Sequence, residues 1–417
     1  MRCAVKFEFG IFISIIILSF LLFYKLTSYL ADFKNIKNQS RIEIVFLTIF
    51  FIFLFVPMSH INQNETSKTE NRTLAKKPLF ITETGEINCK YGKEFDSWFN
   101  DRFLLRDELL DCYVFINLLN KKLSFGNYYY IKKNNWLGMS YNRLFKTRKD
   151  EDISVNYLNS LYDFCNSNNI KLYVLLVPSK EMIYSDELQP FVSKQIIKEN
   201  KKSIEYIINK SKADIVFPIN EIIEEKDKFV FFKTEHHWTQ TGAYIGFVEL
   251  MKIIQKDYQT LKIVSLNNYD SCFDKKVNVD FKREWGVGQT LERIKLLTNY
   301  ANDILDVDYK YYKNQNENIL QEKIFDDEKG RGREYVYPLG YDLKVLQTGT
   351  SMNEALDNFL PYQFKNVKYI RLNTGKMKPT EQQKILKYYK DDILGYKPNI
   401  LIFCITTKNL KHYKEIK

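Results

Sequence analysis

Two apolar runs open the hydrophobic pattern of the chain. Residues 9–24 and residues 44–61 carry no charged side chain, and each run is close to the length that crosses a bilayer as a helix. A signal peptide is the alternative for the first run, but its apolar part is long and no cleavage site of small residues follows it. The pattern therefore predicts a membrane anchor of two transmembrane helices within residues 1–61.

The charges near these runs predict the orientation of the chain. The loop between the runs is flanked by more basic residues (Lys25, Lys34, Lys37 and Arg41) than the N-terminus, which has Arg2 and Lys6. Because positive residues stay on the cytoplasmic side, everything after residue 61 is expected on the exterior of the cell membrane, periplasmic or extracellular. A linker and entry helices are predicted over residues 62–150.

From about residue 151 short apolar runs alternate with amphipathic stretches. Strands are predicted at residues 171–177, 214–217, 343–347, 367–373 and 399–406, and helices at about 153–167, 193–209, 244–254, 353–364 and 381–389. Strands that alternate with helices form a mostly parallel sheet with helices on both faces. We therefore predict an α/β domain over residues 151–417 with about five mostly parallel strands, interrupted by an irregular, charged insertion at about 258–340.

Polar residues follow most of the predicted strands. They are Pro178 to Lys180, Thr348 to Ser351, Asn373 to Gly375 and Thr406 to Lys408. Ligands of parallel sheets bind beyond the carboxyl ends of the strands. These segments are therefore expected at one edge of the sheet, around a binding or catalytic site.

Ser351 lies at the apex of a predicted strand-to-helix turn with the sequence "QTGTSMNEAL". Such a turn exposes the hydroxyl and points backbone N–H groups at the group that the hydroxyl attacks, as in a nucleophile elbow. Gly349 allows close approach of the chain. The alternative is a serine that merely caps a helix.

A nucleophilic serine needs a base, and the chain has four histidines. His60 lies at the predicted membrane edge and His412 beyond the last strand, which leaves the adjacent pair His236 and His237 in "TEHHWTQTGAY". A histidine beside a carboxylate and before a helix suits a serine–histidine–acid arrangement. The alternative is again a capping or surface feature.

Several segments, in the same order, resemble the alginate O-acetyltransferase family and the related DHHW proteins, which have SGNH-hydrolase-like domains. "TEHHWTQTGAY" is similar to the family's D-x-H-W-T-x-x-G-A segment, "LLVPSKEMIY" to its VP-x-K strand end and "GTSMNEALDNFLPYQF" to its nucleophile block. "ENRTLAKKP", "FNDRFLLRDEL" and "NNWLGM" resemble its entry segments and its GxWLF turn.

Carried over to this chain, the resemblance implies Ser351 as nucleophile, His237 as base and Glu235 as the acid that orients it. Gly349, Thr350, Lys180 and Asn373 are candidates for the oxyanion hole or the lining of the site. The chain departs from the family pattern at Glu235 and Thr350, where relatives have aspartate, and at "TTKNL", where relatives often have an acidic–basic pair.

The implied function is O-acetyl transfer to an exterior cell-surface polysaccharide through an acyl-serine intermediate. The implied partners are the polysaccharide acceptor, the lipid bilayer and a membrane-bound O-acyltransferase that supplies acetyl groups. A carbohydrate esterase with the same triad is one alternative. A non-catalytic glycan-binding or scaffold member of a polysaccharide biosynthesis complex is another, which the departures favour.

Composition adds two constraints. The chain has a net charge of +11, which suits an anionic polymer or lipid headgroups, but the charges are scattered and accompany no nucleic-acid-binding motif. The six cysteines include no CxxC pair, and we expect neither a metal nor a cofactor.

Overall fold

The computed structural model describes most of the chain from residue 61 onward. The described residues are 61–67, 72–107, 124–125, 128–131, 136–139, 141–189, 191–232, 236–274, 309–327, 330–371 and 393–412, with a few single positions and short pieces elsewhere. The chain divides into two compact units, Met1–Tyr113 and Val114–Lys417.

The first unit is organised around one buried guanidinium group. Two short strands, β1 (Thr66–Ser67) and β2 (Arg72–Thr73), precede the helix α3 (Tyr91–Arg102). Arg102, at the end of α3, donates hydrogen bonds to the backbone carbonyls of Asn62, Asn64 and Ala75. These bonds join the segment after residue 61 to the end of the helix.

The second unit contains a seven-stranded sheet in the order β10-β11-β13-β12-β14-β6-β7. Its parallel strands are β6 (Lys171–Val177), β7 (Asp214–Val216), β12 (Tyr341–Gly349), β13 (Phe364–Arg371) and β14 (Ile400–Thr406). All five strands predicted from the apolar runs are present and parallel. Their carboxyl ends therefore meet at one edge.

Strand formation extends into the segment that was expected to be irregular. Within 258–340 the structure has β8 (Tyr269–Asp274), β9 (Tyr309–Asn314), β10 (Gln321–Asp327) and β11 (Gly330–Val336). β11 pairs antiparallel with β13 and so extends the main sheet. The prediction failed here because these strands are rich in charged residues, and edge strands and hairpins need no continuous apolar run.

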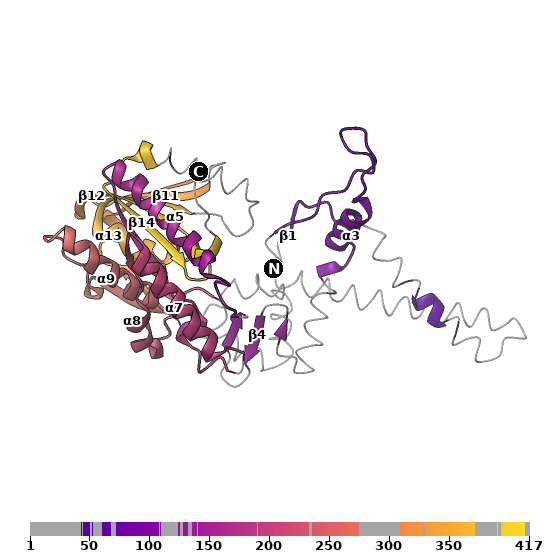
Figure 1. Ribbon diagram of the computed structural model, residues 1–417, viewed down its shortest axis with the longest axis horizontal. Helices are drawn as coiled ribbons and strands as arrows, with labels where there is room; N and C mark the ends of the chain where they lie inside the picture. The colour runs from indigo at the N-terminus through magenta and orange to yellow at the C-terminus, as the bar shows by residue number, and fades with distance from the viewer. Residues whose placement is uncertain are drawn as a thin grey trace, which may run out of the picture. The chain divides into compact units, whose positions relative to one another are not determined.

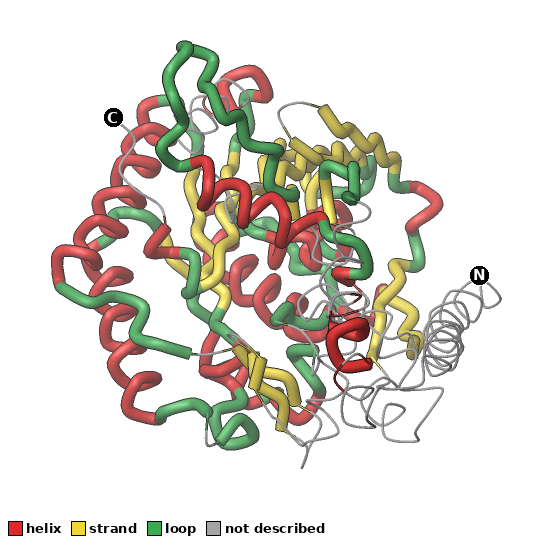
Figure 2. Tube along the Cα trace, turned by 90° about the vertical axis from the view of Figure 1, so that its right-hand side faces the viewer, coloured by secondary structure: helices red, strands yellow, loops and turns green. Residues whose placement is uncertain are grey.

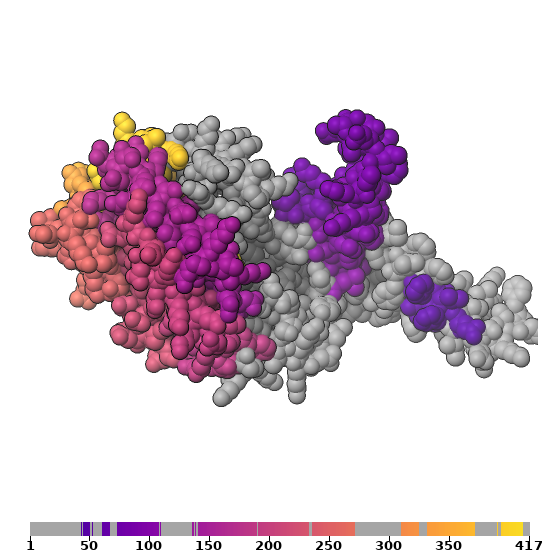
Figure 3. All heavy atoms as spheres, in the orientation of Figure 1, coloured from indigo at the N-terminus to yellow at the C-terminus, as the bar shows by residue number. Residues whose placement is uncertain are grey.

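Helices cover both faces of the sheet (Figure 1; Figure 2). α5 (Arg148–Ser167) and α7 (Lys194–Lys210) pack together, and Figure 3 shows the surface that they form. α9 (Gln240–Asp257) packs on β6 and β7 on the other face. The predicted C-terminal end of the first helix agrees with α5, because Asn168 terminates it and Asn169 adopts a left-handed conformation, whereas α5 begins at Arg148, before the predicted start at about 153.

Shorter elements complete the second unit. They are α6 (Lys180–Ile183), α8 (Ile219–Glu224), α13 (Leu360–Gln363), η2 (Lys226–Lys228), η3 (Leu266–Asn268), η4 (Glu317–Ile319) and η6 (Leu410–His412), with a three-stranded sheet of β3 (Ser124–Phe125), β4 (Tyr128–Ile131) and β5 (Trp136–Met139).

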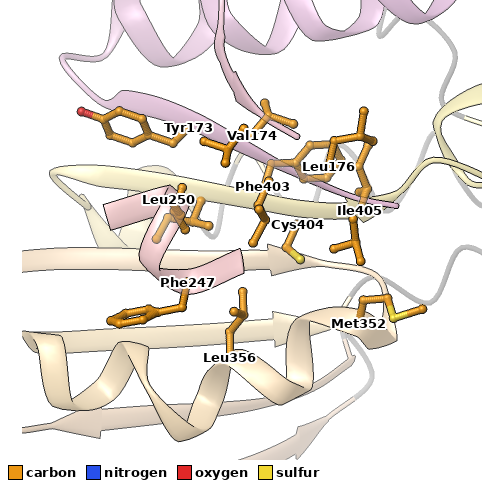
Figure 4. Packing of buried hydrophobic residues seen from close by; sticks show 14 of the residues in the cluster. Tyr173, Val174, Leu176, Phe247, Leu250, Met352, Leu356, Phe403, Cys404 and Ile405 are labelled. Carbon is orange, nitrogen blue, oxygen red and sulfur yellow. The ribbon is translucent and has the colours of Figure 1, made fainter. Parts of the chain in front are cut away.

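The core lies between the sheet and the helices on its two faces. Figure 4 shows buried side chains of β6, β14, α9 and the segment after β12 packed together. Phe403 of β14 contacts Tyr157 of α5, whereas Phe247 of α9 contacts Phe359, which follows β12 in the chain. The central strands β6 and β14 are buried on both faces, which explains their continuous apolar sequence.

Two of the predicted α-helices are not found among the described residues. The segment after β12 is not the predicted α-helix over 353–364 but a 3₁₀ segment, η5 (Ser351–Asn358), followed by the short α13. The helix predicted at 381–389 lies outside the described residues.

The two predicted transmembrane helices find no support in the structure. Among the described residues, no helix has the length and apolar character needed to cross a bilayer. The first apolar run and most of the second lie outside the described residues, so the membrane anchor stays a prediction.

Candidate active site

The histidine pair is held in a short loop before α9. Phe231 and Trp238 form an antiparallel bridge, and the backbone N–H of Phe232 donates to the carbonyl of His237 at 3.1 Å. Thr239 caps α9 by accepting a hydrogen bond from the N–H of Gly242 at 3.3 Å. These bonds fix the backbone of His237 immediately before the helix.

The serine turn depends on close contact between β12 and β14. Gly349 ends β12 with a φ of 148°, and a Cβ atom built there would lie 1.7 Å from the carbonyl oxygen of Cys404. The N–H of Thr350 then donates to that carbonyl at 3.0 Å. Only glycine has the conformation and the space for this turn, which places Ser351 as the first residue of η5.

The two segments bring a base and a hydroxyl into contact. His237 Nε2 lies 2.7 Å from Ser351 Oγ, although 114 positions separate the two residues in the chain. Both side chains are half-buried, so a substrate can reach them. If Nδ1 carries the ring proton, Nε2 accepts from the hydroxyl and can remove its proton.

Trp238 joins the same two segments next to the reactive pair. Its Nε1–H donates to the carbonyl of Met352 at 2.8 Å, and its side chain is only 1% exposed. On α9, a Cβ atom at Gly246 would lie 2.7 Å from the indole ring. The glycine thus lets α9 approach the tryptophan. The bond from Trp238 to Met352 then holds the histidine loop next to the serine turn.

Sequence reasoning missed a buried polar network behind Ser351. Gln347 of β12 donates to the backbone and side-chain oxygens of Asn353 and to Asp357 Oδ1, at 2.9, 3.0 and 3.1 Å. Arg333 and Tyr335 of β11 donate to Asp357 Oδ2 at 3.4 and 3.1 Å. The signal in the sequence was a glutamine, Gln347, directly after the apolar residues Val345 and Leu346 of a predicted strand.

The carboxyl group of Asp357 in η5, which belongs to this network, has a raised pKa. Burial raises the pKa of Asp357 to about 7, and Arg333, Tyr335 and Gln347 only partly oppose that rise. The proton equilibrium of this carboxyl therefore lies near neutral pH.

A charged cluster lies at the ends of β6 and β14. Lys180 is 2% exposed, and its Nζ donates to the carbonyl of Phe232 at 3.2 Å. Glu181 is 1% exposed and pairs with Lys408 at 2.8 Å. Burial opposes ionisation of Glu181, but Lys408 and Lys180 hold its pKa below the usual range.

The candidate residues are thus distributed in three ways. Ser351 and His237 are in contact, with Gly349 and Thr350 in the adjoining turn. Lys180 bonds to the histidine loop. Glu235 and Asn373 lie outside the described residues, so the position of the proposed acid stays a prediction.

No cluster of three or more histidine, cysteine or acidic side chains suited to a metal occurs among the described residues. The contact between His237 Nε2 and Ser351 Oγ has the geometry that a hydroxyl nucleophile and a general base require.

Residues 133–271 match the family model of the SGNH hydrolase-like domain of the acetyltransferase AlgX. The resemblance that the motifs predicted is thereby confirmed. The AlgX-like span includes His237 and Lys180, while Ser351 lies beyond it.

The chain is similar to solved structures at low sequence identity. PatB1 of Bacillus cereus superimposes with a TM-score of 0.51 at 16% identity, over 68% of this chain and 97% of PatB1. A DHHW family protein from Eubacterium siraeum gives a TM-score of 0.46 at 14% identity, over 62% of this chain and 85% of that protein. At such identities the likeness to PatB1 shows a common fold and no more.

One curated protein also matches in sequence. The argonaute of Marinitoga hydrogenitolerans is 20% identical over 273 residues, which make up 59% of this chain and 41% of the argonaute. The chain therefore spans less than half the length of that relative, and an identity this low does not transfer an activity.

Proposed function

We propose that this protein is an O-acetyltransferase that acts on an exterior cell-surface polysaccharide through an acyl-serine intermediate. The observation that carries the proposal is the 2.7 Å contact between His237 Nε2 and Ser351 Oγ. Its support comes from the match of residues 133–271 to the acetyltransferase AlgX domain and from the basic net charge of +11, which suits an anionic polymer.

In the first half-reaction Ser351 Oγ attacks the acetyl carbonyl carbon while His237 Nε2 takes the hydroxyl proton. The tetrahedral intermediate collapses, and the leaving group departs with the proton from the imidazolium. Glu235 is proposed to accept a hydrogen bond from Nδ1–H and so to select the required tautomer.

In the second half-reaction a sugar hydroxyl gives its proton to His237 and attacks the acyl-serine. The ester product forms, and Ser351 Oγ leaves with the proton from His237. The polysaccharide acceptor has to exclude water, because water in the same position would turn the enzyme into an esterase.

The turn around Ser351 offers hydrogen-bond donors for the oxyanion of the tetrahedral intermediate. The N–H of Thr350 already donates to the Cys404 carbonyl. Thr350 is therefore proposed to contribute its hydroxyl, rather than its N–H, to the oxyanion hole. The first N–H groups of a helical segment have no intrahelical acceptor, and the N–H of Ser351 is the first of η5. We propose this group as the main oxyanion donor, with the side chain of Asn373 as a further candidate.

The acetyl group is proposed to come from a membrane-bound O-acyltransferase that hands it across the lipid bilayer.

The test replaces Ser351 by alanine. Ser351→Ala should lower polysaccharide acetylation by more than about 10³-fold, because the nucleophile is lost while the turn keeps its backbone. Ser179→Ala is the control, since Ser179 is a buried serine that likewise lies just beyond the carboxyl end of a parallel strand, with Pro178 between it and β6. Equal acetylation in the Ser351→Ala strain and the control strain would refute the proposal.

A labelling experiment tests the intermediate directly. A solved structure of PatB1 contains a sulfonyl adduct, so a sulfonyl fluoride or a fluorophosphonate is a suitable probe. Mass spectrometry should find the adduct on Ser351 of the full chain. Product analysis with acetyl donor then separates a transferase, which needs the sugar acceptor, from an esterase, which does not.

A further inference from the structure

Lys180 is a buried cation whose position needs an explanation. It is the first residue of α6, directly after Pro178 and Ser179 at the end of β6, and only 2% of it is exposed. Removing an ammonium group from water is costly unless other groups compensate. The described residues around it supply the neighbouring carboxylate of Glu181, the ring of Trp136 at 5.6 Å and the carbonyl of Phe232.

The contact with Phe232 connects Lys180 to the base. The carbonyl of Phe232 accepts from Lys180 Nζ at 3.2 Å, and the N–H of the same residue donates to the carbonyl of His237 at 3.1 Å. Both polar backbone groups of Phe232 are therefore engaged, one by the ammonium and one by the histidine. The loop between Phe232 and His237 is held at its start by a charge-assisted hydrogen bond, which is stronger than a neutral one.

We propose that Lys180 is a positioning residue that orients His237 toward Ser351. It acts through the backbone of Phe232, rather than by donating to an oxyanion at the serine. The inference rests on the proposed function, since it assumes that His237 is the base for Ser351.

The chain supplies a matched control in Lys408. Both lysines lie close to the buried Glu181 and hold its pKa down. Lys408, however, reaches Glu181 from the segment after β14 and lies over the ring of Tyr141. Loss of Lys408 therefore removes a similar charge from the cluster, while the bond between Lys180 and Phe232 is retained.

The experiment measures how fast a fluorophosphonate labels Ser351 in the full chain, purified in detergent. Lys180→Met should lower the labelling rate constant by about ten- to a hundredfold, as expected when a hydrogen bond to a charged group is lost. Labelling should still proceed to the wild-type end point, since every folded molecule keeps its serine. Lys180→Arg, which keeps the charge and a donor, should restore a large part of the rate.

Several outcomes would overturn the inference. They are a wild-type rate in Lys180→Met, an equal loss in Lys408→Met, or a lower end point at an unchanged rate, which indicates partial unfolding. Should Lys180→Met yield no folded protein, Lys180→Gln replaces it, and a wild-type rate in that variant counts equally against the proposal. If Ser351 is not labelled in the wild-type protein, the proposed function fails instead.

Discussion

The proposed catalytic pair consists of the Ser351 hydroxyl and the His237 imidazole, which are both half-buried, and the buried carboxyl of Asp357 lies in the same segment as the serine. Ser351 begins η5, and Asp357 lies in the same segment, where Gln347, Arg333 and Tyr335 bind it. Side chains of β11 and β12 therefore form hydrogen bonds with the segment that begins with Ser351.

The raised pKa of Asp357 predicts a pH dependence of stability. Its pKa is about 7 in the folded protein and about 3.9 in an unfolded chain. The folded state binds the proton more tightly, so the stabilisation by this group is full below about pH 4 and is lost as the pH rises through 7. Between pH 5 and 8 the free energy of unfolding of the wild-type protein should fall by on the order of 2 kcal/mol more than that of Asp357→Asn.

Urea unfolding of both proteins at pH 5 and pH 8 measures this difference. Other groups titrate equally in the two proteins, so they cancel in the comparison. Parallel pH dependence of the two unfolding free energies would show that Asp357 is ionised throughout this range.

At the scale of elements, the site is a contact between the start of α9 and the start of η5. Trp238 bridges them, with its ring against Gly246 of α9 and its N–H on the Met352 carbonyl. The 3₁₀ conformation of η5 is unusual for eight residues. The side-chain amide of Gln347, which binds Asn353 and Asp357 within η5, helps to hold it.

Trp238→Phe tests this bridge. Phenylalanine keeps an apolar ring but removes the indole N–H, which leaves the carbonyl of the buried Met352 without this partner. We expect a loss of about 1–3 kcal/mol in the unfolding free energy, measured by urea denaturation, together with slower labelling of Ser351. Trp98→Phe in α3 of the first unit is the control, and an equal effect of both substitutions would contradict a specific role for Trp238.

At the scale of the whole molecule, the chain combines an apolar N-terminal region with an α/β unit that holds the candidate active site. The second apolar run ends at Ile61, and Ile61 pairs with Phe103 in the first compact unit. The chain thus continues into folded structure directly after that run.

Removal of residues 1–61 tests the predicted anchor. The full chain should stay in the membrane fraction through carbonate extraction, because two apolar helices bind the bilayer hydrophobically. The truncated chain should appear in the soluble fraction. Release of the full chain by carbonate would show that it is bound peripherally or not at all.

Sequence alone determined the five parallel strands and their common polar edge, because buried strands require continuous apolar runs and their ends require polar residues. It also indicated Ser351 through the serine turn and the pair His236 and His237 through the scarcity of histidines, and the family resemblance then implied His237 as the base. The tertiary structure decided which of these residues meet. It also decided that β11 extends the sheet, that η5 is a 3₁₀ segment and that Lys180 binds the histidine loop. Those features depend on contacts between residues far apart in the chain, which no local pattern of polar and apolar positions specifies.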